Sequence, residues 1–411
     1  MNNSSPRSVL KGTFYLLTFL TFIGVVFFAL FATVKNETIF GYKVSELAGE
    51  VKPSAGIHKR RRMDISAKET KIVILYWSRA FGVTPPVNSN PRAWPFFYAG
   101  HNCPISCELT TDKRRVHEAS VLVVHARNTH ELPPKIYRNL TWILHTNENP
   151  VYTASLRDPK IMKQFNYFAS YRLDSDFPCP EFLKPTLVPP VPFTEKTGLV
   201  VAVFSNCEPV RTRYLAELMK YIQVDSYGAC LRNKNTLAKR RAKTSRHDVT
   251  EVQRNYKFSV VFPNSDCDFY MTEKIYSALS AGSVPIWLGT DGIDEVLHWG
   301  NLKHSIIKVK DFSSPKALAE FLTKLSENET EYNKYLKWKY EGFQFPKEYY
   351  DSPIGQWWDG LPLYCRVCLK VAHDPQGHEG LPVDKCDGQQ RRTMEKWLGN
   401  ITNIDQKNHR Q

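Results

Sequence analysis

The stretch from residue 258 to residue 289, FSVVFPNSDCDFYMTEKIYSALSAGSVPIWLG, contains the pattern that decides the fold. Four of its first five residues are apolar and two of these are β-branched valines, which predicts a buried strand, and a polar turn region follows. From Thr272 apolar side chains recur at helical spacing until Gly282 ends the helix, and 284–288 predict a second buried strand. The unit is therefore a βαβ crossover with polar residues at the strand-to-helix turn, where open α/β sheets bind anionic ligands.

Short apolar runs and helical patterns alternate on both sides of this unit. Strands are expected over 72–77, 119–125, 140–145, 167–171, 199–204, 224–227 and 305–309, and helices over 210–222, 293–299 and 315–326. This alternation predicts parallel sheets covered by helices. Six prolines within 177–192 exclude a regular helix or a central strand, so this segment is interpreted as the linker between two α/β domains.

The N-terminal region predicts a membrane anchor. Residues 14–34 form an uncharged apolar run of about the length that spans a bilayer, and Arg7 and Lys11 precede it. The positive-inside tendency then places the tail 1–13 in the cytoplasm and everything after the anchor in the lumen, beginning with a stem over 35–70. A cleaved signal peptide is the alternative, although the run is long for one and no clear small-residue cleavage site follows.

Other features agree with a lumenal address. Four N-glycosylation sequons follow the apolar run, at Asn36, Asn139, Asn328 and Asn400. All nine cysteines also follow it, so disulfides are expected with one cysteine left over. The close-spaced pairs predict local disulfides, Cys103 with Cys107 and Cys365 with Cys368; zinc is the alternative that a C-x-x-C pair leaves open.

The net charge of +14 would ordinarily suggest a nucleic-acid partner, but a lumenal address excludes one. Part of the charge lies in two basic runs, 59–62 and 239–243, which are interpreted as solvated loops. The first run is alternatively a cleavage site for a proprotein convertase in the exposed stem.

The strand-to-helix turn contains the side chains that could bind a ligand. Thr272 is expected to cap the helix, and the free N–H groups there, with the Lys274 ammonium, predict a phosphate site. The Glu273 carboxylate suits two hydroxyl groups of a ribose. The alternative interpretation is an ordinary capped helix start without a ligand.

These residues carry a resemblance to a known family. The spacing Asn264-x5-Tyr270-x-Thr272-Glu273-Lys274, followed by Ala281-Gly282-x-Val284-Pro285 and Leu288-Gly289, resembles the donor-binding signature of the alpha-1,3/4-fucosyltransferases. Further similar elements lie at Tyr171-Arg172-x-Asp174-Ser175-Asp176, Ser205-Asn206, Arg211-x2-Tyr214, Val224-Asp225-x-Tyr227-Gly228 and Cys365-x-x-Cys368. The resemblance covers about residues 71–370.

The resemblance implies a fold, an activity and an address. The fold would be α/β with two Rossmann-like domains of GT-B type after one transmembrane helix: an acceptor-side domain over 71–192, a GDP-fucose domain over 193–370 and an extension over 371–411. The activity would be transfer of fucose from GDP-fucose to a hydroxyl of N-acetylglucosamine on a glycoprotein glycan, with inversion and an expected alpha-1,3 linkage. Such enzymes are single-pass type II proteins of the Golgi membrane and need neither a bound metal nor another cofactor.

It also implies roles for six residues. Asn264, Tyr270, Glu273 and Lys274 would contact the nucleotide sugar, and the Arg211 guanidinium would bind its diphosphate. Glu148 matches the glutamate of the family's Glu-Ser-Pro element, which serves as the general base on the acceptor side.

Some positions depart from the family pattern. Pro263 stands where a glutamate is usual, His125-Ala126-Arg127 replaces His-His-Arg, and Asn149 replaces the serine beside the base. The run 337–342, KWKYEG, is similar to one in enzymes that fucosylate the N-glycan core. These departures concern the acceptor and the turnover rather than the fold.

Two alternative functions stay open. Asp174-x-Asp176 and Asp266-x-Asp268 each read as the Asp-x-Asp element of a metal-dependent glycosyltransferase. The missing glutamate at Pro263 would also fit a catalytically silent lumenal protein that binds GDP-fucose or a glycan.

Overall fold

The computed structural model describes residues 71–79, 103–235, 237 and 246–386 of the chain. The first of two sheets is parallel throughout and has the order β2-β1-β3-β4-β5-β6. Its strands are β1 (Ile72–Tyr76), β2 (Cys107–Thr110), β3 (Val121–His125), β4 (Thr141–Thr146), β5 (Tyr167–Ser170) and β6 (Phe177–Pro178). The short edge strand β6 lies at the start of the proline-rich segment, where an edge tolerates proline.

The second sheet contains the βαβ unit and is also parallel, with the order β11-β10-β9-β7-β8. Its strands are β7 (Gly198–Ala202), β8 (Val224–Ser226), β9 (Tyr256–Val261), β10 (Val284–Trp287) and β11 (Ile307–Lys308). Helix α6 (Glu273–Ala281) connects β9 to β10, as the sequence predicted. Gly282 ends α6 with a left-handed φ of 67°, and a side chain there would collide with Pro190.

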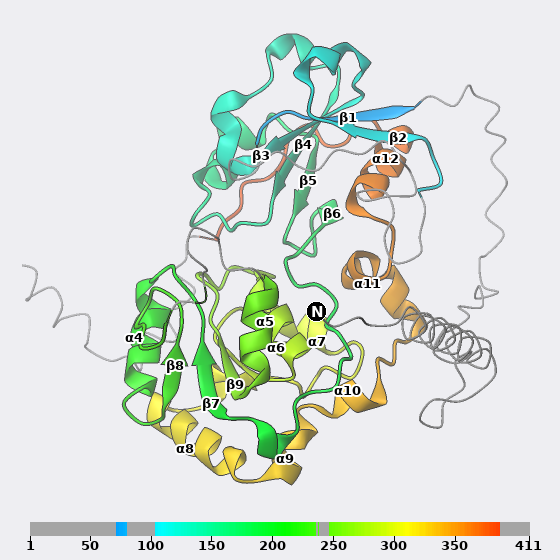
Figure 1. Ribbon diagram of the computed structural model, residues 1–411. Coiled ribbons are helices and arrows are strands. Elements are labelled where there is room, and N and C mark those ends of the chain that lie inside the picture. Colours follow the sequence, from blue (N-terminus) through cyan, green and yellow to red (C-terminus); the bar gives the residue numbers. More distant parts are fainter. Residues whose placement is uncertain (1–70, 80–102, 236, 238–245, 387–411) are drawn as a thin grey trace, which may run out of the picture. The chain divides into compact units, whose positions relative to one another are not determined.

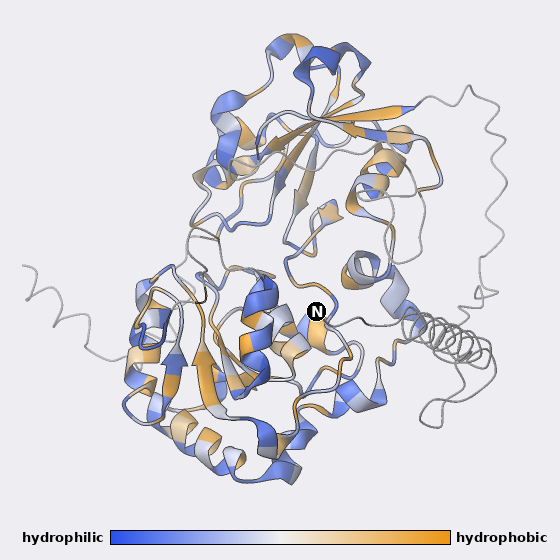
Figure 2. Cartoon of the chain, viewed as in Figure 1, coloured by the Kyte–Doolittle hydropathy of each residue, from blue (hydrophilic) through white to orange (hydrophobic). Residues whose placement is uncertain are grey.

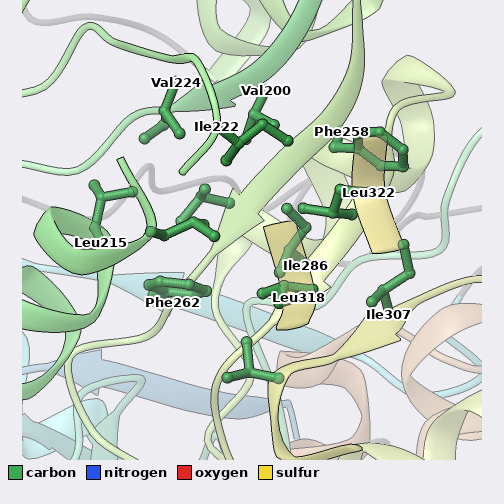
Figure 3. Packing of buried hydrophobic residues seen from close by; sticks show 14 of the residues in the cluster. Val200, Leu215, Ile222, Val224, Phe258, Phe262, Ile286, Ile307, Leu318 and Leu322 are labelled. Carbon is green, nitrogen blue, oxygen red and sulfur yellow. The ribbon is translucent and has the colours of Figure 1, made fainter. Parts of the chain in front are cut away.

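The core of the second sheet consists of side chains from the strands and from helices α4 (Pro209–Leu218) and α8 (Pro315–Ser326). Figure 3 shows Phe258 beside Leu322, Ile286 beside Leu318, and Val200 beside Ile222. Figure 2 shows the strands mostly in the hydrophobic colour, whereas α5 (Arg246–Arg254) is mostly hydrophilic. This pattern is typical of a sheet buried on both faces by amphipathic helices.

Helix α5 was not predicted, and it packs beside α6 and against β9 (Figure 1). The remaining α-helices are α3 (Pro159–Met162), α7 (Asp294–Leu297), α9 (Glu329–Lys334), α10 (Lys337–Glu341), α11 (Pro353–Trp358) and α12 (Leu363–His373). Short 3₁₀ helices cover Lys113–Glu118, Ala126–Glu131, Lys135–Tyr137, Ala154–Arg157, Phe193–Glu195, Asp291–Ile293, Val309–Asp311 and Lys347–Asp351.

Helix α12 corrects the predicted disulfides. Cys103 pairs with Cys365 and Cys107 pairs with Cys368, at Cα–Cα distances of 5.4 and 6.3 Å, so neither local pair forms. The two helical cysteines are three residues apart, on one face of α12, and this face packs against β1, β2 and β6. Both sulfurs therefore meet partners on the first sheet, although α12 follows the second sheet in the sequence.

Two more disulfides lie near the loops of the second sheet, Cys207–Cys230 and Cys267–Cys386. Cys179 is the odd cysteine, as the count of nine predicted, and its thiol is buried. Burial raises its pKa to about 12, so the thiol stays protonated.

Several predictions lie outside the described residues: the anchor 14–34, the stem, both basic runs, Asn36 and Asn400. No helix in the described ranges is long and apolar enough to cross a bilayer. Asn139 and Asn328 are exposed, as acceptor sites must be. The Asn328 side chain accepts a hydrogen bond from the Glu331 backbone at 3.1 Å, which uses its oxygen and not the amide nitrogen that a glycan would modify.

Candidate functional site

A pocket of about 570 Å³ opens where the loops after β7, β8 and β9 meet the start of α6. All six residues with predicted roles line it together: Glu148, Arg211, Asn264, Tyr270, Glu273 and Lys274. The first follows β4 of the first sheet, and the other five belong to the second half of the chain. The pocket therefore joins residues that are more than one hundred positions apart in the sequence.

The loops after β7 and β8 form one wall. Gly228 lies directly against the backbone of Phe204, so any side chain at 228 would collide with that carbonyl. The disulfide Cys207–Cys230 joins the same two loops. Both features hold Ser205 and Asn206 in fixed positions at the pocket edge.

The start of α6 also lines the pocket, and it corrects one prediction. Thr272 occupies the capping position, but its hydroxyl makes no capping hydrogen bond. This hydroxyl is buried and has no hydrogen-bond partner within the described part of the chain. A buried hydroxyl without a partner is costly, and at a helix N-terminus it can be satisfied by the oxygen of a bound ligand.

Glu273 and Lys274 place opposite charges at the same helix start. The Lys274 ammonium lies 2.5 Å from a Glu273 carboxylate oxygen. Burial alone would raise the pKa of the Glu273 carboxyl, but the charge and hydrogen bond of Lys274 and the charge of Arg246 lower it overall. The carboxylate is therefore ionised and able to accept hydroxyl groups, while the ammonium is available to phosphate.

Arg211 lies at the pocket but its guanidinium is already engaged. It donates to the backbone carbonyl of Phe262 at 2.6 Å and twice to that of Asn206, and it stacks on the Phe204 ring at 4.6 Å. The side chain is buried, with 2% of its surface exposed. Its observed contacts join the loop after β7 to the loop after β9, a role that sequence reasoning did not assign.

Glu148 also lines the pocket, and it lies within a small hydrogen-bonded group. The Tyr270 hydroxyl donates to Glu148 Oε1 at 2.6 Å. Burial, and then the charge of Glu148, raise the Tyr270 pKa well above its usual value, so this hydroxyl keeps its proton. Asn149 Nδ2 donates to the same oxygen at 2.9 Å and to Asn264 Oδ1 at 3.0 Å.

The first Asp-x-Asp element has structural partners. Asp174 forms an ion pair with Arg172, and Asp176 accepts from the Phe168 backbone at 2.9 Å and lies 2.8 Å from His378 Nε2. Both aspartates, with Asp268 of the second element, line a separate pocket. Within the described ranges no three His, Cys, Asp or Glu side chains form a group that could hold a metal ion.

Sequence reasoning missed two cations of the pocket, Arg232 and Arg246. Arg246 begins α5 and forms an ion pair with Glu181, which precedes the second sheet. Val249 and Val252, at helical spacing in the sequence, were the available signal for α5. Pro263, where the family has glutamate, is buried after β9 and does not line the pocket.

The KWKYEG run also has a structural role. Lys339 is buried, and its ammonium donates to the backbone carbonyls of Thr186, Val188 and Ser280 at 2.8, 3.1 and 3.1 Å. It thereby attaches the proline-rich segment 177–192 to the end of α6. Lys339 and Trp338 do not line the pocket, so this run gives no direct information on the acceptor.

Two parallel α/β sheets, with a polar pocket at the carboxyl ends of the strands, define the chain as an α/β protein with a nucleotide-type site. Residues 193–382 match the model of the glycosyltransferase family 10 (fucosyltransferase) C-terminal region, and residues 69–181 match the fucosyltransferase N-terminal model. The chain therefore belongs to glycosyltransferase family 10, the fucosyltransferases.

Individual proteins of known name match the chain over about half of its length. The chain is 35% identical over 226 residues to GDP-fucose protein O-fucosyltransferase 3 of Danio rerio, covering 51% of this chain and 49% of the relative. The Homo sapiens protein of the same name is 34% identical over 228 residues, with 51% and 46% covered. The chain thus spans about half the length of the curated relatives it matches.

Solved structures are also similar to it. A crystal structure of an alpha1,3-fucosyltransferase with GDP has a TM-score of 0.48 and 16% identity, covering 79% of this chain and 96% of that one. A second, with GDP-fucose, has a TM-score of 0.42 and 16% identity over 69% and 85% of the two chains.

Proposed function

We propose that this protein transfers fucose from GDP-fucose to an acceptor hydroxyl with inversion, with Glu148 as the general base. The observation that carries the proposal is one pocket lined both by the Glu148 carboxylate, which follows strand β4 of the first sheet, and by Glu273 and Lys274 at the helix start of the second. Family membership supplies fucose as the sugar and GDP as its expected carrier.

The donor fits the polar groups of the pocket. The Glu273 carboxylate would accept ribose hydroxyls, and Lys274 and Arg246 would meet the diphosphate. The Thr272 hydroxyl, which has no partner among the described residues, would meet it as well. Arg211 would act by holding the two loops that carry these contacts. No metal ion is needed in this scheme, because the cations of the chain neutralise the leaving group.

The chemical step follows from this arrangement. Glu148 removes the proton of the acceptor hydroxyl as its oxygen attacks C1 of fucose from the side opposite GDP. The new C1–O bond forms while the bond from C1 to the phosphate oxygen breaks, and its electron pair leaves with GDP. Lys274 and Arg246 stabilise the charge that develops on the departing diphosphate.

Glu148→Gln tests the mechanism. The amide cannot take the proton, so turnover should fall by about 10²–10⁴-fold, while GDP binding stays within about twofold. Steady-state kinetics and calorimetric GDP titration measure the two effects. Near-normal turnover would reject Glu148 as the base, and GDP-fucose binding without transfer in the unchanged protein would favour the catalytically silent alternative.

EDTA treatment tests the proposed independence from metal. We expect full activity after chelation and gel filtration. Activity that disappears and returns with Mn²⁺ or Mg²⁺ would instead support the Asp-x-Asp alternative.

The acceptor has two candidates. The family resemblance favours a GlcNAc hydroxyl of a glycan, whereas the name of the matched relatives favours a hydroxyl of a polypeptide. Incubation with GDP-fucose and a panel of lactosamine, LacdiNAc, core N-glycan and folded protein acceptors separates them. Mass spectrometry then locates fucose on the sugar or on serine or threonine.

The address is part of the proposal. We place the protein in the Golgi membrane with its catalytic part in the lumen, on the basis of the apolar run 14–34 and the four sequons. Sensitivity of the glycans to N-glycosidase and protection of the C-terminal part in intact vesicles test this topology.

A further inference from the structure

Asn149 occupies an unusual position beside the proposed base. Its side chain is fully buried, with 0% of its surface exposed, and all of its polar atoms have partners. Its oxygen accepts from the backbone N–H groups of Val151 and Tyr152 at 3.0 and 3.3 Å. Its amide nitrogen donates to Glu148 Oε1 and to Asn264 Oδ1, so both N–H bonds of the amide are used.

These contacts make the two oxygens of Glu148 different. Oε1 accepts from the Tyr270 hydroxyl at 2.6 Å, from Asn149 Nδ2 at 2.9 Å and from the Asn149 backbone at 3.1 Å. Oε2 accepts no hydrogen bond from the described residues. Because an oxygen with three donors is a poorer proton acceptor, Oε2 is the basic atom.

We propose that Asn149 is a positioning residue that turns Glu148 so that Oε2 receives the acceptor proton, and that it couples this base to the donor loop through Asn264. The proposal rests on the proposed function. It assigns a role to a residue at which this chain departs from the Glu-Ser-Pro element of the family.

Serine could not perform both tasks. A serine hydroxyl has one O–H bond, which could reach Glu148 while its oxygen accepts the backbone N–H groups of the turn. It would then have no donor for Asn264. The asparagine amide supplies the second donor and therefore links the base, on the first half of the chain, to a residue of the nucleotide-sugar pocket.

The two proposed roles of Asn149, orienting Glu148 and contacting Asn264, predict different kinetic effects. Asn149→Asp keeps the shape and the oxygen that organises the turn, but it removes both donors and places a second carboxylate against Glu148. Asn149→Ser keeps a donor for Glu148 and loses the link to Asn264. The other ionisable groups that line the pocket are Tyr227, Tyr270, Glu273, Arg211, Arg232, Arg246 and Lys274.

The experiment measures GDP release from GDP-fucose by the purified full chain, with the acceptor identified by the panel or with water as acceptor, between pH 5 and 9. For Asn149→Asp we expect kcat near neutral pH to fall at least tenfold and the acid limb of the profile to move up by about one pH unit, since two adjacent carboxylates resist joint ionisation. For Asn149→Ser we expect kcat within about threefold and a KM for GDP-fucose raised by about five- to tenfold.

Asn166→Asp is the matched control. Asn166 also lies between strands of the first sheet, and its side chain accepts from the Trp142 backbone and donates to the carbonyls of Gln376 and His378. The same substitution there removes an amide donor away from the pocket, so the pH profile and kcat should not change even where thermal stability falls.

Three results would overturn the proposal. One is a folded Asn149→Asp protein with an unchanged kcat and pH profile while Glu148→Gln is impaired. Another is an Asn149→Ala effect on kcat of undiminished size in the Glu148→Gln background, because the effect of Asn149 on kcat is proposed to act through Glu148. The third is an Asn149→Ser protein with unchanged KM, which rejects the link to Asn264. Near-normal turnover of Glu148→Gln, by contrast, would reject the proposed base itself.

Discussion

At the scale of single residues, Arg211 and Lys274 line the same pocket but differ in burial and in hydrogen-bond partners. The Arg211 guanidinium is buried and donates to the carbonyls of Asn206 and Phe262, whereas Lys274 has 22% of its side chain exposed and pairs with Glu273. Arg211 therefore maintains the loops, and Lys274 is available to a ligand.

The substitution Arg211→Lys should lower the free energy of unfolding by about 2–4 kcal/mol, because one ammonium cannot satisfy two carbonyls on different loops. GDP binding should be lost with it. Urea unfolding followed by fluorescence measures the first effect. An unfolding free energy equal to that of the unchanged protein would show that the two carbonyls do not depend on Arg211.

The substitution Lys274→Ala should weaken GDP binding but leave the stability of the fold almost unchanged. The free energy of unfolding should change by less than about 1 kcal/mol, since the Lys274–Glu273 pair is partly solvated. GDP affinity should fall by about 10–100-fold, as a charge-assisted contact to phosphate is removed. Calorimetric titration with GDP checks this result; unchanged affinity would place the diphosphate elsewhere in the pocket.

At the scale of secondary-structure elements, α12 is the helix that the disulfides hold to the first sheet. The Cys103–Cys365 link spans 262 positions of the sequence, and the Cys107–Cys368 link spans 261. Because the two links join the same pair of segments, either one alone should keep α12 on the sheet.

Cysteine substitutions test this pairing. Cys103→Ser should leave Cys365 as the new free thiol, and Cys107→Ser should leave Cys368, as alkylation and mass spectrometry of the denatured protein would show. Each single loss should lower the free energy of unfolding by about 2–4 kcal/mol or less, and loss of both links should lower it further. A free Cys107 in the Cys103→Ser protein would instead restore the local pairing predicted from sequence.

At the scale of the whole molecule, two histidines at the ends of β3 and β4 make stability depend on pH. Burial, and then the charge of Arg127, lower the pKa of His125 to about 4; burial, and then His125, lower that of His145 to about 3. In the unfolded chain both pKa values are about 6.5. At pH values between the folded and the unfolded pKa of each histidine, the unfolded chain binds more protons than the folded chain. Acidification therefore favours unfolding.

Acidification from pH 7 to pH 5 should therefore lower the free energy of unfolding by about 1–2 kcal/mol for each histidine. Urea titrations at pH 7, 6 and 5 measure this slope, and this range lies above the titration of most carboxyl groups. Replacing both histidines by glutamine should flatten it. An equal slope in the doubly substituted protein would assign the pH dependence to other groups.

The sequence by itself determined the elements whose signals are local. The apolar run before Asn264, the helical spacing after Thr272 and the stop at Gly282 predicted β9, α6 and β10, because strand and helix periods depend on neighbouring residues. Spacing that resembles a family also named the six residues that line one pocket, and their roles stay predictions. The polar α5 was missed, since its burial depends on α6.

Only the tertiary structure decided which distant groups meet. It paired Cys365 and Cys368 with the first sheet and left the Thr272 hydroxyl without a capping hydrogen bond. It also engaged Arg211 with two loop carbonyls and placed Asn149 between Glu148 and Asn264. Such contacts arise from packing between segments that are separated by many residues. Periodicity describes one segment at a time, so it carries no information on the partner that a buried polar group finds when the two halves of the chain pack together.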